Sequence, residues 1–226
     1  MLTTRQWLGL DCTHVVNVDQ RHRLHPKAAQ AFSALQQAAQ DDGVDCQLVS
    51  GFRDFHHQAR IWNNKWLGIT VIRDLNDNPV SASDLTDVEK LHHILTFSAL
   101  PGGSRHHWGT DMDVFDRQQV TQRNHDFQLI SAEYDTDGPC ATLNQWLTEH
   151  AAQFGFTRPY QTYTGGVAVE PWHLSYSPVA QQIEGLLDVQ PLADAIAEQD
   201  IAGKACILAH IEALFSRYTL NQGDTP

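Results

Sequence analysis

The residues best suited to chemistry lie in one segment, residues 101–116, which reads Pro-Gly-Gly-Ser-Arg-His-His-Trp-Gly-Thr-Asp-Met-Asp-Val-Phe-Asp. Residues 110–115 alternate in character, which predicts a strand with Asp111 and Asp113 on one face. A carboxylate on a strand that also carries Met, Val and Phe is poorly hydrated, so it needs a cation or several hydrogen-bond donors nearby. Imidazole and carboxylate ligands together suit zinc, and His106 and Asp113 supply one of each.

A third candidate ligand lies about sixty residues further along, in residues 170–176, Glu-Pro-Trp-His-Leu-Ser-Tyr. Residues three apart on a regular strand point to opposite faces, but Pro171 favours a bend or a strand start because it lacks a backbone N–H. His173 can therefore face a metal from the strand while Glu170 approaches from the turn. A carboxylate beside a zinc-bound water typically acts as the general base of a metallopeptidase.

Three blocks of the sequence resemble a known family. The pattern Ser-x-His-x-x-Gly-x-x-x-Asp at residues 104–113, followed by Glu-Pro-Trp-His at 170–173, is similar to the signature of the VanY-type D-alanyl-D-alanine carboxypeptidases, which are zinc metallopeptidases. Upstream, residues 49–58 resemble that family's Ser-Gly-Tyr-Arg…Gln segment, with Phe in place of the more common Tyr. With the preceding helix, the blocks span residues 20–177. Asp111 departs from the pattern, because many members carry a small residue such as Ala there.

The resemblance implies an enzyme that hydrolyses the bond before a terminal D-alanine in a peptidoglycan stem peptide or muropeptide. It implies that His106, Asp113 and His173 bind Zn²⁺ and that Glu170 is the general base. It also places Arg53 in the active site as a catalytic and substrate-binding residue. A guanidinium can hold a carboxylate through two parallel hydrogen bonds, so Arg53 is expected either to bind the terminal carboxylate of the substrate or to polarise the scissile carbonyl.

Two further polar residues, Ser104 and Gln58, are expected to contact the substrate. Ser104 opens the central block, where its hydroxyl has the alternative role of capping the turn. Gln58 belongs to the upstream block and lies near the start of an expected amphipathic helix. Both assignments follow from the resemblance.

Two other functions fit the same residues. One is a peptidoglycan endopeptidase of the lysin type, which cuts within the stem or cross-bridge and needs no free terminal carboxylate. The other is a non-catalytic zinc module that binds wall peptides. Such a module requires a fourth protein ligand in place of water, with Asp111 or His107 as candidates, and it leaves Glu170 without a purpose.

Charge and hydropathy limit the partners. The net charge of −12 over 226 residues argues against nucleic acid, which needs a basic surface, and against electrostatic adhesion to anionic membranes. No stretch is apolar enough to span a bilayer, and the N-terminus has no signal-peptide core. We therefore expect a cytoplasmic protein, or a periplasmic or cell-wall protein if an export signal has been removed. The expected partner is a peptidoglycan-derived peptide, and the sequence does not indicate an oligomeric state.

The periodicity of apolar residues predicts the elements that position these side chains. Residues 26–41 predict a helix that begins at a proline and buries one stripe of residues, namely Ala28, Phe32, Leu35 and Ala39. Residues 44–50 predict a short strand that ends just before Arg53. His106 and His107 are expected on extended backbone, pointing in opposite directions. Further helices are expected at residues 84–96, 143–154 and 204–218, and a hairpin at 156–169.

These elements predict an α+β fold in which a small antiparallel sheet carries the zinc site and packs against helices. Residues 1–177 are expected to form the zinc peptidase domain. Residues 178–226 contain three helical segments that the resemblance does not cover. They are expected to form a helical C-terminal extension packed on that domain.

Overall fold

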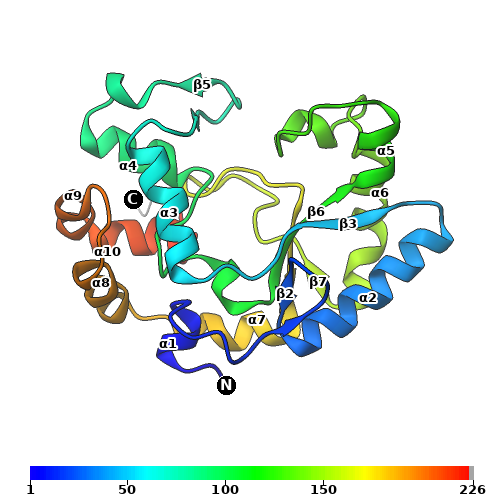
Figure 1. Ribbon diagram of the computed structural model, residues 1–226, viewed down its shortest axis with the longest axis horizontal. Coiled ribbons are helices and arrows are strands. Elements are labelled where there is room, and N and C mark those ends of the chain that lie inside the picture. The colour runs from blue at the N-terminus through cyan, green and yellow to red at the C-terminus, as the bar shows by residue number, and fades with distance from the viewer. Residues whose placement is uncertain (224–226) are drawn as a thin grey trace.

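A four-stranded antiparallel sheet lies at the centre of the computed structural model, which describes residues 1–223 (Figure 1). In this sheet Asp113 lies opposite Ser50 on one side and opposite His173 on the other. The pairing therefore brings together the three blocks that the sequence separates. In spatial order, the strands are β3 (Cys46–Ser50), β6 (Asp111–Asp116), β8 (His173–Tyr176) and β7 (Phe156–Thr157).

One face of the sheet packs against helices α2 (Pro26–Asp41) and α6 (Ala141–His150). The alternation predicted for β6 is present, since Met112 and Val114 are fully buried in this core. Helix α2 has the predicted bounds and buries the predicted residues, Ala28, Phe32, Leu35 and Ala39. Because this face is apolar, Asp111 and Asp113 are left to the opposite face, where the site is built.

Truncating Phe32 is expected to lower the free energy of unfolding by about 3–5 kcal/mol, the usual cost of removing a buried aromatic side chain. Phe32 is 2% exposed and packs edge-on against Phe156, with ring centroids 6.4 Å apart. Denaturant unfolding of Phe32→Ala measures the change. The control is Ser33→Ala, at the neighbouring exposed position, which should stay within about 0.5 kcal/mol of the parent.

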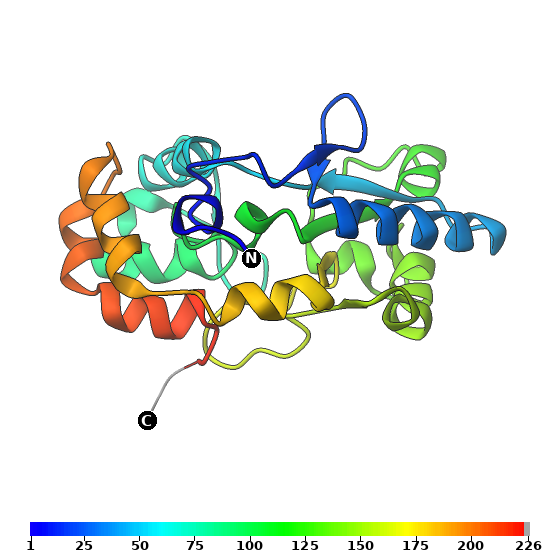
Figure 2. The ribbon, with the colours of Figure 1, turned by 90° about the horizontal axis from the view of Figure 1, so that it is seen from below.

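A second group of helices forms the other lobe, with its own apolar core. Helices α3 (Phe55–Trp66) and α4 (Asp87–Leu95) pack there with α8 (Val189–Glu198), α9 (Lys204–Ala209) and α10 (Ile211–Leu214). Figures 1 and 2 both show the last three helices beside α4 and away from the sheet.

The C-terminal helices are also bonded to the rest of the chain. The indole nitrogen of Trp62 on α3 donates to the carbonyl of Ala202, 2.9 Å away. The division into residues 1–177 and 178–226 stays a prediction, because the described part of the extension shares its core with α3 and α4. Residues 224–226 lie outside the described residues.

Several sequence expectations about local structure were wrong. No hairpin forms over residues 156–169, because β7 pairs with β8 instead. Helix α4 begins only at Asp87, where Thr86 and Glu89 form a capping box. The helix expected over residues 204–218 is divided into α9, α10 and a π-helical turn, Phe215–Thr219.

The remaining α-helices and strands are short and connect the two lobes or lie at their edges. They are α1 (Thr4–Trp7), β1 (Val16–Asn17), β2 (Arg23–Leu24), β4 (Ile72–Arg73), β5 (Pro79–Val80), α5 (Arg117–Gln122) and α7 (Ser177–Glu184).

In residues 1–223 no helix is both long and apolar enough to cross a bilayer.

Candidate active site

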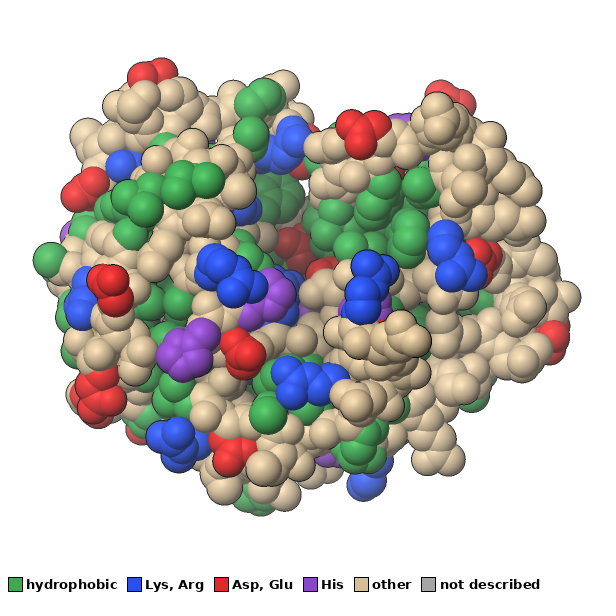
Figure 3. Space-filling view, viewed as in Figure 1, with side chains coloured by type: hydrophobic (Ala, Val, Ile, Leu, Met, Phe, Trp, Pro, Cys, Tyr) green, Lys and Arg blue, Asp and Glu red, His purple; other side chains and the backbone are tan. Residues whose placement is uncertain are grey.

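A cavity of about 520 Å³ opens between the two lobes. Its lining includes side chains from both lobes and from the π-helical turn near the C-terminus. In the space-filling view, acidic side chains lie deep in the cleft, and hydrophobic side chains cover the wall on the sheet side (Figure 3). The polar residues of the lining that concern the chemistry are Arg53, Lys65, Ser98, Ser104, His106, Asp113, Glu170 and His173.

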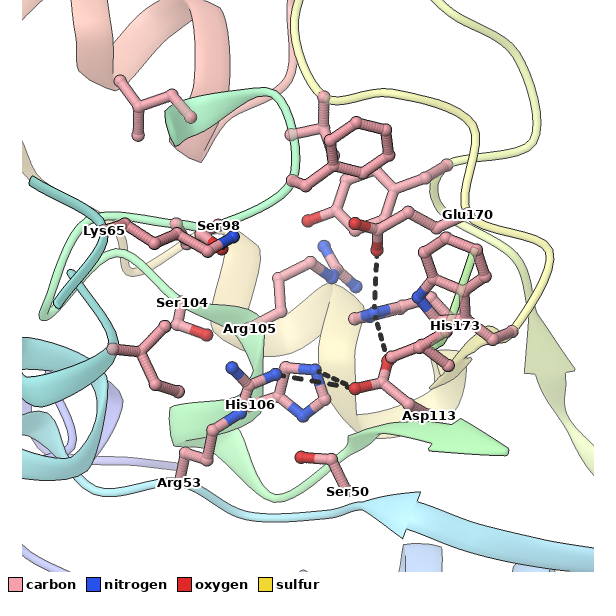
Figure 4. Close-up of a pocket in the computed structure, with 18 of the residues that line it drawn as sticks. Ser50, Arg53, Lys65, Ser98, Ser104, Arg105, His106, Asp113, Glu170 and His173 are labelled. Carbon is pink, nitrogen blue, oxygen red and sulfur yellow. Dashed lines mark hydrogen bonds and ion pairs between the residues drawn. The ribbon is translucent and has the colours of Figure 1, made fainter. Parts of the chain in front are cut away.

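The three predicted metal ligands converge at the base of this cavity (Figure 4). His106 Nε2 lies 3.3 Å from Asp113 Oδ2, and His173 Nδ1 lies 3.2 Å from Asp113 Oδ1. One ligand atom from each residue lies within 4.8 Å of the others. All three residues are buried, with exposed fractions of 3–4%. They are the type of ligand set that zinc takes in catalytic sites.

His106 reaches this position from a 3₁₀-helical turn, Arg105–Trp108, and not from the extended backbone expected. Gly109 ends the turn with φ +70°, and a Cβ atom there would lie 2.5 Å from the Val15 side chain, so only glycine fits. The turn sends His107 elsewhere: the Gly102 N–H donates to its Nε2, while its Nδ1 lies 2.6 Å from the Arg53 carbonyl. His107 is therefore a buried structural residue.

The tautomers of the two histidines test whether a metal fits. The outer nitrogen of each ring faces an acceptor: His106 Nδ1 is 2.9 Å from the Gly51 carbonyl, and His173 Nε2 is 3.0 Å from Asp111 Oδ2. With a proton on each outer nitrogen, both inner nitrogens direct lone pairs at the Asp113 carboxylate. Lone pairs and a carboxylate repel one another unless a cation lies between them.

The electrostatics of the group favour a cation in the same place. Asp113 Oδ1 is buried without a hydrogen-bond partner among the described residues. Burial opposes protonation of His173, yet its contacts with Asp111, Asp113 and Glu170 outweigh this and raise its pKa. The site thus attracts positive charge, and these residues fit zinc.

Asp111, which departs from the family pattern, orients His173. Its side chain is fully buried, and Oδ2 receives hydrogen bonds from His173 Nε2 and from Arg105 Nε, the latter at 2.6 Å. Oδ1 accepts hydrogen bonds from the hydroxyls of Ser175 and Thr110, at 2.9 and 2.8 Å. Asp111 lies behind the ring of His173, so neither it nor His107 joins the ligand group.

Replacing Asp111 by Asn should weaken zinc binding by about 10- to 100-fold, the usual effect of losing a carboxylate that orients a metal-bound histidine. An amide has one oxygen and no charge, so it cannot accept hydrogen bonds at both ends as the carboxylate does, and it leaves Arg105 without its buried counter-charge. Competition with a chromogenic chelator measures the dissociation constant. Asp116→Asn is the matched control, because Asp116 is buried on the same strand but caps α5. An equal loss in both variants would show a general structural effect.

Glu170 lies where the sequence predicted, beside the ligands. Its Oε2 is 3.4 Å from His173 Nδ1, and the His173 N–H donates to the Glu170 carbonyl, which closes the turn around Pro171. Burial raises the pKa of the Glu170 carboxyl, although His173 opposes the change. A raised pKa suits a carboxylate that must accept and release a proton.

Arg53 and Gln58 are joined by a hydrogen bond, and Arg53 lies across the cavity from Glu170 (Figure 4). An amino group of Arg53 lies 3.6 Å from Asp113 Oδ2, so the guanidinium is next to the ligand group. Its Nη1 donates to Gln58 Oε1 at 3.0 Å, and Gln58 Nε2 donates to the Ala99 carbonyl at 2.8 Å. Gln58 is fully buried and does not line the cavity, so it lies behind Arg53.

Ser104 lines the cavity and makes no side-chain cap bond to the turn that follows, so the alternative role as a cap is absent. Sequence reasoning missed Tyr160, whose ring centroid is 4.9 Å from that of His173 and which also lines the cavity. It lies in a loop without periodicity, and no spacing signal marks it. Whether Ser104 and Gln58 contact a substrate stays a prediction.

Comparisons with known proteins agree with this geometry. Residues 21–179 match the family described as VanY, D-alanyl-D-alanine carboxypeptidase. Over 125 residues the chain is 34% identical to an uncharacterized protein of Haemophilus influenzae. The aligned region covers 54% of this chain and 95% of that protein.

Two solved structures share the fold. The vancomycin resistance D,D-pentapeptidase VanY, in complex with Zn(II), aligns with a TM-score of 0.52 and 24% identity over 75% of this chain and 82% of that one. VanYB in complex with D-alanine-D-alanine aligns with a TM-score of 0.55 and 22% identity, over 84% and 91%. At these identities the likeness shows the fold alone. The family match over most of the chain shows that this protein is an enzyme of the VanY family, the D-alanyl-D-alanine carboxypeptidases.

Proposed function

We propose that this protein is a zinc-dependent DD-carboxypeptidase that hydrolyses the terminal D-Ala-D-Ala bond of peptidoglycan stem peptides or muropeptides. The observation that carries the proposal is the convergence of His106, Asp113 and His173, with the non-ligand carboxylate of Glu170 3.4 Å from one ligand. A purely structural zinc site has no use for such a carboxylate. Support also comes from the family match and from VanYB, a structural neighbour bound to D-alanine-D-alanine.

In the proposed reaction, His106, Asp113 and His173 would hold the zinc ion. When bound, zinc supplies Lewis acidity, which polarises a carbonyl and lowers the pKa of a coordinated water to about 7. Glu170 accepts a proton from the attacking water as its oxygen forms a bond to the scissile carbonyl carbon. The same carboxyl then delivers the proton to the leaving amine nitrogen as the C–N bond breaks.

Arg53 stabilises the negative charge that develops on the carbonyl oxygen, because its guanidinium lies next to the ligand group. Gln58 holds Arg53 in place through its side-chain oxygen, and Asp111 holds His173. Asp111, Asp113 and His173 are themselves buried, and burial strengthens each charge–charge interaction.

The test is to incubate the purified protein with a muropeptide ending in D-Ala-D-Ala, with and without a chelator, and to measure the products by mass spectrometry. The proposal predicts a mass loss of one alanine residue and release of free D-alanine, both abolished by the chelator and restored by zinc. Cleavage within the stem would indicate an endopeptidase. Zinc binding without cleavage would indicate a non-catalytic module.

A further inference from the structure

One charged side chain in the cavity is not used by the proposed reaction. Lys65, on α3, extends toward the open space, and its ammonium group donates to Ser98 Oγ at 2.7 Å (Figure 4). Lys65 and Ser98 lie across the cavity from Glu170 and His173. Within residues 1–223 no carboxylate lies within ion-pair distance of Lys65. A partly buried ammonium with only a neutral partner is suited to receive an anion.

The other cations of the cavity are already engaged. Arg53 lies against Asp113, and Arg105 is paired with Asp111 and with Glu184, both at 2.6 Å. Arg73 donates to the backbone carbonyl of Asp77 near the hairpin of β4 and β5. Lys65 is thus the deeply placed cation that remains for a substrate carboxylate.

The position of Arg53 strengthens this assignment. A carboxypeptidase must stabilise the oxyanion at the scissile carbonyl and bind the terminal carboxylate one residue further along. Because Arg53 lies next to the ligand group, it is placed for the first requirement, which leaves the second to another donor. Lys65 is a charged donor available in the lining. Lys65 and Ser104 lie on the side of the cavity opposite Glu170 and His173 (Figure 4). We therefore expect the last residue of a peptide to lie on that side when its scissile carbonyl is at the ligands.

We propose that Lys65, held by Ser98, binds the C-terminal carboxylate of the substrate and so selects peptides with a free C-terminus. The inference rests on the proposed function and deepens it, since it names the residue that makes the enzyme a carboxypeptidase and not an endopeptidase. Burial lowers the pKa of Lys65 to about 8, with Arg53 and Arg73 acting in the same direction and Glu170 opposing them. A bound carboxylate would offset the free-energy cost of keeping the ammonium charged in this buried position.

The experiment measures binding, so that it does not depend on turnover. In zinc-loaded Glu170→Gln protein, calorimetry gives the dissociation constants of an acetylated tripeptide ending in D-Ala-D-Ala and of its C-terminal amide. We expect the free acid to bind about 10- to 100-fold more tightly, the usual range for a charged hydrogen bond. Adding Lys65→Met should remove that preference by weakening binding of the acid while leaving the amide unchanged.

Two further variants accompany it. Ser98→Ala should reduce the preference by a smaller factor, because the ammonium loses its anchor but keeps its charge. Lys27→Met, at an exposed position on α2, should leave the preference unchanged. An acid-to-amide ratio that stays the same in Lys65→Met, or a lack of preference in the parent, would overturn the inference. Failure of the proposed function would instead be seen as an absence of hydrolysis when Glu170 is intact.

Discussion

Replacing Glu170 by Ala, or by the isosteric Gln, is expected to reduce kcat by about 10²- to 10⁴-fold, the usual contribution of a general base. The protein should keep one zinc ion per chain, because Glu170 lies beside the ligand group and is not part of it. Steady-state kinetics on a D-Ala-D-Ala peptide measure the first effect, and elemental analysis after dialysis measures the second.

The control for this prediction is Glu149→Gln, a change of an exposed carboxylate on α6. It should retain the parent's kcat and zinc content. If Glu170→Gln hydrolysed the peptide at the parent's rate, the role of general base would be wrong. If it lost zinc instead, Glu170 would be a ligand.

Replacing His106 by Ala should remove both zinc and activity. His106 supplies one of three ligand atoms, and its loss leaves Asp113 and His173 with too few donors to hold the ion against dialysis. We expect zinc affinity to fall by more than the roughly 100-fold that follows from removing a residue that only orients a ligand. Metal content after dialysis and the chelator-competition constant both report the change.

His150→Ala is the matched control, because it also removes one imidazole but from the surface of α6. It should bind zinc as the parent does. Full zinc occupancy in His106→Ala would show that the metal binds elsewhere.

The sequence predicted the parts of the fold that depend on local periodicity. Helix α2 matches its expected bounds because its apolar stripe and its first-turn proline are both local signals. The alternation in β6 likewise separated the face that packs from the face that carries Asp111 and Asp113. The convergence of the three predicted ligands and Glu170 was anticipated from residue type and spacing, with the order of the blocks supplied by a resemblance.

The parts that depend on contacts between distant segments were not predictable in this way. The 3₁₀ turn at His106 is set by Gly109, whose close approach to Val15 and His25 no spacing reveals. Nor could periodicity show that Gln58 lies behind Arg53, since this depends on a bond to the Ala99 carbonyl.

The network around Asp111 is of the same kind. It joins β6, β8 and α7, because Arg105 bridges Asp111 to Glu184. The sequence places Lys65 in an expected helix but gives no sign of its partner, Ser98. Lys65 reaches the cavity because α3 packs beside residues 95–100. Side chains that act through such long-range pairs leave no periodic trace.

The most direct test is a zinc-edge anomalous difference map from crystals of the zinc-loaded protein. We predict one strong peak per chain, bonded to His106 Nε2, the Asp113 carboxylate and His173 Nδ1, with its remaining vertex open to the cavity. A peak elsewhere, or a fourth protein ligand filling that vertex, would contradict the account.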